Sequence, residues 1–292
     1  MDIFVLQVLN SLFYASVLFL LAAGLSLIFG VMGIINMAHG SLFALGAYVT
    51  AWAVGSAVGS VNILFLFLLL PVGAIAVAVA GLIIEPTLLR PMYKRREEYQ
   101  LLITFGLLLV LEDFMHVVWG GTPLTASELI DAVGIIHVGE YIYPTYNLLV
   151  IGIGIVAAIS LWAFVYRTKF GVMLRATSQN MKMASALGLN VRRVYMQAFA
   201  IGCFMAGLGG AIVVPSQAAV LGMGLDFLIL AFVVVVIGGL GSLEGALIGA
   251  LIVSFVRTGV IQFYEEFELA VLYLIAAVVL LIRPTGLFGK PS

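Results

Sequence analysis

The sequence predicts an all-α polytopic membrane protein, and three observations lead to that class. The stretch from Ile3 to Ile84 contains no Asp, Glu, Lys or Arg. Charged residues make up 9% of the 292-residue chain, against about 25% in soluble domains. Several apolar stretches approach or exceed the roughly 20 residues that a helix needs to span the hydrocarbon layer. Because lipid offers the backbone no hydrogen-bond partner, we expect these stretches to be helices.

Hydropathy predicts about eight hydrophobic segments in a single transmembrane domain over residues 1–292. In chain order they are Phe4–Phe29, Asn36–Val54, Ile63–Ile84, Leu101–Trp119, Tyr146–Tyr166, Tyr195–Leu221, Phe227–Val256 and Leu269–Ile282. The first is expected to be an uncleaved segment, because Met1-Asp2 carries no positive charge and the apolar stretch after it is too long for a signal peptide. Cys203, the only cysteine, lies in an apolar stretch, which excludes disulfides and cysteine metal sites.

The distribution of charge predicts which loops are cytoplasmic. Basic residues gather in 90–96, in 167–193 and after Arg283, whereas the loop 112–140 contains acidic residues and no Lys or Arg. Cytoplasmic loops of membrane proteins are enriched in Lys and Arg. The basic stretches are therefore expected inside and the acidic loop outside.

The last third of the chain predicts a helix that is interrupted within the membrane. Arg193 and Arg283 should both be inside, so the three segments between them must cross the membrane an even number of times. Segment Phe227–Val256 is longer than one span and shorter than two, and Gly238–Gly241 interrupts it. We interpret it as two half-helices. A rival interpretation makes the short segment Leu269–Ile282 re-entrant. Pro215 is expected to kink the segment before them.

A similar interruption occurs near the start of the chain, at Gly30–Gly33. The pairs His39-Gly40 and Glu244-Gly245 follow the two interruptions, and the next spans end at Arg90-Pro91 and Arg283-Pro284. This correspondence predicts an internal parallel repeat in which segments one to three match segments six to eight. On that arrangement the N-terminus would lie inside.

Interrupted segments at matching positions of two halves indicate the solute route of a transporter. The candidate pathway residues are Asn36, His39, Gly40, Ser41, Gly238, Gly239, Gly241, Ser242 and Glu244. Ionisable groups at membrane depth are costly and suggest a function. The alternative places His39 and Glu244 at interfacial helix ends, with Asn36 and Ser41 as helix caps.

The basic loop, about residues 167–194, predicts a docking element for a cytoplasmic partner. Ser178 can cap a short helix on which Met181, Ala184 and Leu187 share one face, and Gly188 is placed to end it. The alternative is a basic helix that lies on anionic lipid.

The sequence contains no catalytic constellation and no nucleotide-binding motif. Gly289-Lys290 is followed by Pro291 and lacks the upstream glycine of a phosphate-binding loop, and the three histidines are dispersed. We therefore expect a transport subunit with no catalytic residues, no metal and no cofactor of its own, and no nucleic-acid partner. If ATP drives the protein, another subunit binds it.

Five stretches together resemble the LivH-type permeases of branched-chain amino-acid ABC importers. They are Gly24–Gly40, Arg90-Pro91, Lys182–Asn190, Gly238–Ala246 and Arg283–Gly289. The resemblance implies a bacterial inner (plasma) membrane subunit that pairs with a LivM-type permease. It also implies two cytoplasmic ATPase subunits that bind ATP-Mg and an extracytoplasmic substrate-binding protein.

The resemblance further implies that the loop helix couples the permease to the ATPase. The residues that match the coupling helix and its surroundings are Lys182, Ala184, Ser185, Leu187, Gly188 and Arg192. Family members often carry Pro where this chain has Glu244, so a pathway role for Glu244 rests on its position alone. Related permeases also move urea and short amides, so mechanism is better defined than cargo. The alternative function is an ion-coupled secondary carrier or channel that uses His39 or Glu244.

Overall fold

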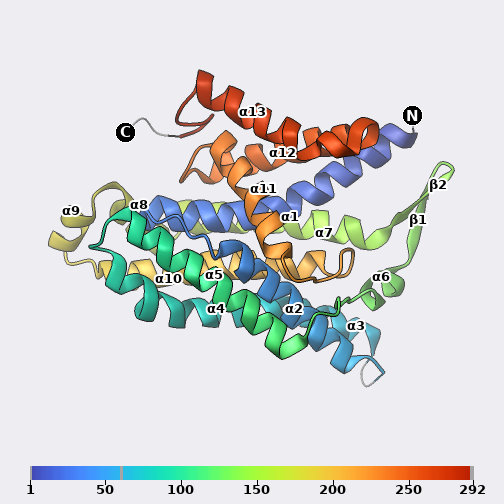
Figure 1. Cartoon of the computed structure of the whole chain (residues 1–292), viewed down its shortest axis with the longest axis horizontal. Coiled ribbons are helices and arrows are strands. Elements are labelled where there is room, and N and C mark those ends of the chain that lie inside the picture. The colour runs from blue at the N-terminus through green and yellow to red at the C-terminus, as the bar shows by residue number, and fades with distance from the viewer. Residues whose placement is uncertain (1, 60–61, 290–292) are drawn as a thin grey trace.

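The chain forms a bundle of long helices that lie roughly along one direction (Figure 1). This computed structural model describes residues 2–59 and 62–289, so Met1 and Lys290 of the basic tail lie outside the described residues. Seven helices in the described part are long and apolar enough to cross a membrane, and two shorter apolar helices accompany them. The prediction of an all-α, multi-pass membrane protein is confirmed.

The helices follow the predicted segments closely. The first half contains α1 (Asp2–Met32), α2 (His39–Ala57), α3 (Ile63–Leu66), a 3₁₀ turn (Phe67–Leu69), α4 (Leu70–Ile84), a π turn (Glu85–Leu89), a second 3₁₀ turn (Arg90–Met92) and α5 (Glu97–Trp119). The second half contains α6 (Glu128–Val133), β1 (Ile135–Val138), β2 (Tyr141–Pro144), α7 (Thr145–Arg167), α8 (Lys169–Gln179), α9 (Met181–Ala186), α10 (Val191–Val213), α11 (Met223–Gly238), α12 (Leu243–Tyr264), a 3₁₀ turn (Glu265–Phe267) and α13 (Glu268–Ile282).

Glycines let the central helices approach each other closely. A Cβ on Gly46 of α2 would collide with the backbone of Gly207 in α10, and a Cβ on Gly24 of α1 would meet the carbonyl oxygen of Gly202. In lipid no hydrophobic effect drives helices together, so their association depends on close packing. Small residues at such crossings permit that close approach of the backbones. The core therefore lies where α1, α2 and α10 meet.

The two ends of the bundle differ in charge. At one end the Tyr93 ring contacts Tyr195 at 5.2 Å between centroids, which brings the basic turn after α4 to the start of α10 beside α8 and α9. At the other end the acidic loop carries the β1–β2 hairpin, in which Val138 pairs with Tyr141. Figure 1 shows the hairpin and α9 at opposite ends of the bundle. The excess of Lys and Arg makes the α9 end the inner end.

The N-terminus lies at the outer end of the bundle, not inside as the predicted repeat implied. The Asp2 carboxylate lies against Gly139 in the hairpin turn, so α1 begins at the outer end. The prediction counted the first interruption as part of the second segment, whereas it follows α1. The predicted match of segment one with segment six is also wrong, because α1 runs inward whereas α10 runs from α9 outward to the loop that bridges Leu124. Helices α1, α2 and α4 instead share their order and direction with α11, α12 and α13.

The sixth segment ends earlier than predicted. Helix α10 stops at Val213, so Pro215 lies beyond the helix and does not kink it. The chain then forms a bridge between Ala219 and Leu124 of the outer loop. Gly222, at a φ of 86°, precedes α11, which crosses the bundle steeply in Figure 1.

Both predicted interruptions are present. Residues 33–38 separate α1 from α2, and residues 239–242 separate α11 from α12. The prediction that the seventh segment is broken is therefore confirmed, although α12 extends to Tyr264 and is a full-length helix. The rival interpretation is wrong, because α13 continues without a break from the outer turn to the inner tail.

Candidate functional site

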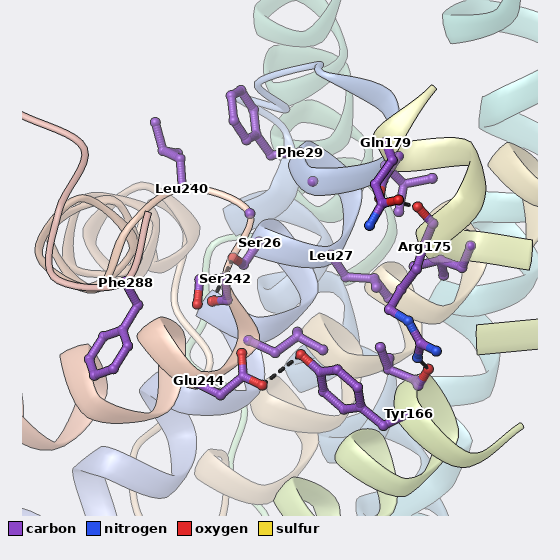
Figure 2. A pocket seen from close by; sticks show the side chains of 17 residues that line it. Ser26, Leu27, Phe29, Tyr166, Arg175, Gln179, Leu240, Ser242, Glu244 and Phe288 are labelled. Carbon is purple, nitrogen blue, oxygen red and sulfur yellow. Dashed lines mark hydrogen bonds between the residues drawn. The ribbon is translucent and has the colours of Figure 1, made fainter. Parts of the chain in front are cut away.

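A cavity of about 690 Å³ opens at the inner end of the bundle beside the α11–α12 break (Figure 2). Its walls come from the last turns of α1, the junction of α7 and α8, the break itself and the tail after α13. The polar and charged residues that line it are Ser26, Tyr166, Arg175, Ser178, Gln179, Ser242 and Glu244. A polar cavity that adjoins non-helical backbone is the arrangement that membrane proteins tolerate at such breaks.

Glycines make the break possible. Gly239 has a φ of 107° and Gly241 a φ of 80°, a region that residues with a Cβ rarely adopt. A Cβ on Gly238 would collide with the carbonyl oxygen of Gly245, so the two helices touch through their backbones on either side of the break. The glycines predicted for the pathway therefore shape the break.

The tail after α13 completes the end of α11. The N–H groups of Leu287 and Phe288 donate to the carbonyl oxygens of Ile237 and Gly238, each at 2.9 Å. The last carbonyls of a helix have no partner within the helix, so the tail satisfies two of them. Phe288 also lines the cavity.

Helix α1 lies directly against the other side of the break. The Ser26 hydroxyl donates to the carbonyl oxygen of Ser242 at 3.1 Å, and a Cβ on Gly30 would lie 3.1 Å from the Cα of Gly241. The Ser242 hydroxyl in turn accepts a hydrogen bond of 3.0 Å from the N–H of Gly245, as a helix cap does. The end of α1 is thus in contact with the start of α12.

Two charged side chains line opposite parts of this cavity. The Glu244 carboxylate accepts a hydrogen bond of 2.6 Å from the Tyr166 hydroxyl, and the Arg175 guanidinium lies 5.1 Å from the centroid of the Tyr166 ring. Figure 2 shows Tyr166 between the two charged groups. Arg175 also donates to the carbonyl oxygen of Val165. Glu244 is exposed at the start of α12, where the helix dipole favours an anion.

The predicted pathway residues divide into two groups. Gly241, Ser242 and Glu244 line the inner cavity, and Gly238 and Gly239 lie in the break behind it. Asn36, His39, Gly40 and Ser41 are buried at the start of α2, and none of them lines this cavity. The structure therefore does not bring His39 and Glu244 to one site.

The start of α2 lies deep in the bundle. His39 Nε2 is 3.1 Å from the carbonyl oxygen of Leu21, near the middle of α1, and donates to it in the tautomer that this contact requires. Asn36 Oδ1 accepts from the N–H of Ala38 at 3.1 Å. Among the described residues, His39 Nδ1, Asn36 Nδ2 and Ser41 Oγ are buried without a partner. Such groups each cost roughly 1–3 kcal/mol and call for an explanation.

Sequence reasoning missed three of the residues that line the cavity. In the sequence Tyr166 is only the end of an apolar segment, Arg175 is one cation of the basic loop, and Ser26 lies within the first apolar segment. Their positions beside Glu244 depend on the packing of α1 and α7 against α12, which no local pattern reports. Ser26 lies before the interruption at Gly30–Gly33 and is not part of it. Only its polarity within an apolar segment could have drawn attention to it.

The short helix α9 projects from the inner end of the bundle (Figure 1). Asn180, not Ser178, caps it: the Asn180 side chain accepts from the N–H of Met183 at 2.9 Å, whereas Ser178 lies within α8. The predicted end is confirmed, since Gly188 follows α9 with a φ of 85°. The predicted coupling residues that are exposed are Lys182, Ser185, Leu187, Gly188 and Arg192. Ala184 is turned inward and buried.

Comparison with known proteins gives a consistent result over nearly the whole chain. Residues 7–282 match a family described as "Branched-chain amino acid transport system / permease component". The permease protein LivH of the Escherichia coli K12 high-affinity branched-chain amino acid transport system is 29% identical, with 99% of this chain and 96% of LivH aligned. The corresponding protein BraD of Pseudomonas aeruginosa is 26% identical, with 98% of this chain and 96% of BraD aligned.

A permease with a different named cargo is also similar. The ribose import permease protein RbsC of Escherichia coli K12 is 28% identical over 284 residues, covering 92% of this chain and 84% of RbsC.

Proposed function

Since the chain belongs to the branched-chain amino acid transport permease family, we propose that it forms the solute route of an importer for branched-chain or other neutral amino acids. It is a permease subunit of an ATP-binding-cassette importer, and its role is transport. ATP hydrolysis then resides in two cytoplasmic ATPase subunits that bind ATP-Mg. A second, LivM-type permease and an extracytoplasmic binding protein complete the proposed assembly in the bacterial inner membrane.

The observation that carries the coupling part of this proposal is the exposed apolar surface of α9. Met183 in α9 and Leu187 just after it are 58% and 75% exposed. Both lie at the inner end of the bundle, where the basic loops are expected to extend into the cytoplasm. Apolar side chains that project into water suit a groove on another protein better than solvent. With Lys182 and Arg192 beside them, they form a surface for an ATPase subunit.

The contacts of the inner cavity suggest how movement of α9 reaches the solute route. Helix α9 packs on α8 and α8 packs on α7, and Tyr166 of α7 holds Glu244 at the start of α12. A displacement of α9 would therefore act on the α11–α12 break through adjoining elements. We assign the candidate pathway to this break, with Gly238, Gly239, Gly241, Ser242 and Glu244 as its residues.

The buried start of α2 supports the second part of the predicted pathway. Partnerless polar atoms of Asn36, His39 and Ser41 are expensive in a closed bundle. Water or a solute group that reached them in another conformation would supply the missing hydrogen bonds. Gly40 packs against Gly224 of α11, so a shift of α11 would expose this cluster.

Reconstitution tests the proposed function. The assembled importer in proteoliposomes should transport labelled leucine when ATP is on the inner side, where α9 lies, and the binding protein is on the outer side. The chain alone, under a proton or sodium gradient, should take up none. Uptake by the chain alone, driven by an ion gradient, would favour the secondary-carrier alternative and refute the ATP-driven one.

A further inference from the structure

A second cavity of about 390 Å³ lies in the outer half of the bundle, between α1, α11, α12 and α13. It contains charged groups that the sequence analysis did not single out. Its polar residues are Tyr14, Gln217, Asp226, Arg257 and Glu268. The volume falls in the range of small-molecule sites, about 300–1,000 Å³.

Arg257 is the central group of this outer cavity. It belongs to the membrane-spanning helix α12, and its side chain is only 14% exposed. Its Nε donates to the Glu268 carboxylate at 2.5 Å, and its guanidinium lies 4.2 Å from the centroid of the Tyr14 ring. An arginine at this depth is costly and indicates a function when it faces a cavity.

The guanidinium is only partly satisfied. Arg257 Nη1 is buried and has no hydrogen-bond partner among the described residues. Guanidinium N–H groups recognise carboxylates, often through two parallel hydrogen bonds. An unmatched donor that adjoins a cavity is therefore suited to a carboxylate that arrives with a ligand.

Asp226 provides the opposite charge. It lies in the first turn of α11 and lines the same cavity, and no ion pair in the described part of the chain involves it. The remaining wall is largely apolar and includes Phe227, Leu230 and Leu269. The cavity thus combines a cation with a free donor, an unpaired anion and an apolar wall.

We propose that this outer cavity is a subsite for a zwitterionic amino acid with an aliphatic side chain. Arg257 binds the α-carboxylate, Asp226 binds the α-ammonium group, and the apolar wall holds the side chain. The inference rests on the proposed function, because it gives the permease its own contacts with the solute before the solute reaches the α11–α12 break. A neutral sugar has neither charge and would gain nothing from this pair.

Protection of a cysteine in the full chain within the assembled importer tests the subsite. Val220 lines the cavity and is 39% exposed, and Val58, at the outer end of α2, is outside the cavity and 43% exposed. Val220→Cys and Val58→Cys are labelled from outside with an impermeant maleimide, while the native Cys203 is fully buried. Leucine should slow labelling of Val220→Cys and leave that of Val58→Cys unchanged.

Three probes separate the two charged contacts. Leucine has both groups, 4-methylpentanoate has only the carboxylate, and leucinamide has only the amine. Each incomplete probe should need about tenfold higher concentration for equal protection, because a hydrogen bond to a charged group contributes at least that factor. Equal protection by all three in the Val220→Cys chain would overturn the proposal, as would no protection by leucine in an importer that transports it.

Variants assign the contacts to residues. Arg257→Gln combined with Glu268→Gln avoids leaving a buried carboxylate unpaired, and it should remove the advantage of leucine over leucinamide. Glu268→Gln alone loses the same ion pair but keeps the guanidinium, so it should retain that advantage. Asp226→Asn should remove the advantage of leucine over 4-methylpentanoate. Loss of the leucine advantage in Glu268→Gln as well would assign Arg257 a purely structural role and overturn the proposal.

These results are distinct from a failure of the proposed function. If the unsubstituted importer hydrolyses ATP but moves no amino acid, the proposed function is wrong. If it moves leucine and the protection pattern is absent, only the subsite is wrong.

Discussion

The Tyr166 hydroxyl donates a 2.6 Å hydrogen bond to the Glu244 carboxylate and so joins the inner end of α7 to the first turn of α12. The bond spans 78 positions in the sequence, and both residues line the inner cavity. It connects the side of the bundle that carries α8 and α9 with the α11–α12 break. Movement of α9 is therefore expected to reach the solute route through this contact.

Removal of the Tyr166 hydroxyl should therefore weaken coupling. Tyr166→Phe loses a partly exposed hydrogen bond worth about 1 kcal/mol. The number of leucine molecules imported per ATP hydrolysed should fall several-fold, while ATP hydrolysis continues. Uptake and phosphate release measured on the same proteoliposomes give this ratio. Tyr141→Phe, at a similarly exposed position in the outer hairpin, is the matched control, and a ratio equal in the two variants would contradict the role of Tyr166.

Docking of α9 gives a second prediction. Leu187→Asp places a charge on a side chain that is 75% exposed, so the fold should tolerate it while an apolar groove should not. We expect normal insertion, loss of ATP-driven uptake and weaker co-purification of the ATPase subunits. Ile142→Asp makes a comparable change at a 61% exposed position on the outer hairpin and should leave association unchanged. Coupled uptake at the normal rate in Leu187→Asp would rule out the docking role.

The close approach of α2 to α11 predicts an unusual sensitivity to one methyl group. A Cβ on Gly40 would collide with the carbonyl oxygen of Gly224, and overpacking of this kind costs about 1–3 kcal/mol. Gly40→Ala should lower the midpoint of thermal unfolding in detergent. Gly55→Ala, in the same helix with open space around it, should raise the midpoint slightly, because Ala favours a helix by about 1 kcal/mol over Gly. The same midpoint in both variants would contradict the packing described here.

A buried ion pair at the inner end of α4 gives a fourth prediction. Arg90 contacts the fully buried Glu85 carboxylate at 2.6 Å, and Tyr93 donates to the same group. Burial, followed by the hydrogen bond to Glu85, raises the pKa of Tyr93 above its ordinary value, so its hydroxyl remains a donor to Glu85 even in alkaline solution. Arg90→Ala leaves a buried carboxylate without its cation, at a cost of about 3 kcal/mol.

The control for this pair is the exposed pair of Arg96 and Glu98, which has the same 2.6 Å separation. Exposed pairs contribute about 0–1 kcal/mol, so Arg96→Ala should hardly change the unfolding midpoint. Thermal unfolding in detergent, measured for both variants side by side, checks the difference. Equal losses would show that burial of Glu85 does not set the cost.

Much of the fold could be predicted because, in lipid, the backbone N–H and C=O groups must find hydrogen-bond partners within the protein, which favours helices. Length and hydropathy identify helices such as α5 and α7, and the glycines at 238–241 identify the break, since these signals are local. The end of α10 was misplaced because Ala218, Ala219 and Val220 are apolar although they lie in an outer loop. The side of the N-terminus was misassigned because Asp2 is the only charge near it, and its contact with Gly139 is a tertiary one.

The candidate site could be predicted only in part, for the same reason. Gly241, Ser242 and Glu244 lie within the break, so its sequence signal includes them. Arg175 lines the cavity from another part of the chain, and its basic surroundings predicted a docking loop and not a cavity wall. Arg257 was overlooked because its partner Glu268 lies 11 positions away, across the turn between α12 and α13.

The most direct test of the account blocks the inner cavity chemically. Ser178 lines that cavity, whereas Lys169, on the same helix α8, is exposed outside it. Ser178→Cys and Lys169→Cys are labelled completely from the cytoplasmic side with a bulky maleimide, and ATP-driven leucine uptake by the assembled importer is then measured. Uptake should stop in labelled Ser178→Cys and continue in labelled Lys169→Cys. Undiminished uptake by fully labelled Ser178→Cys would contradict a solute route beside the α11–α12 break.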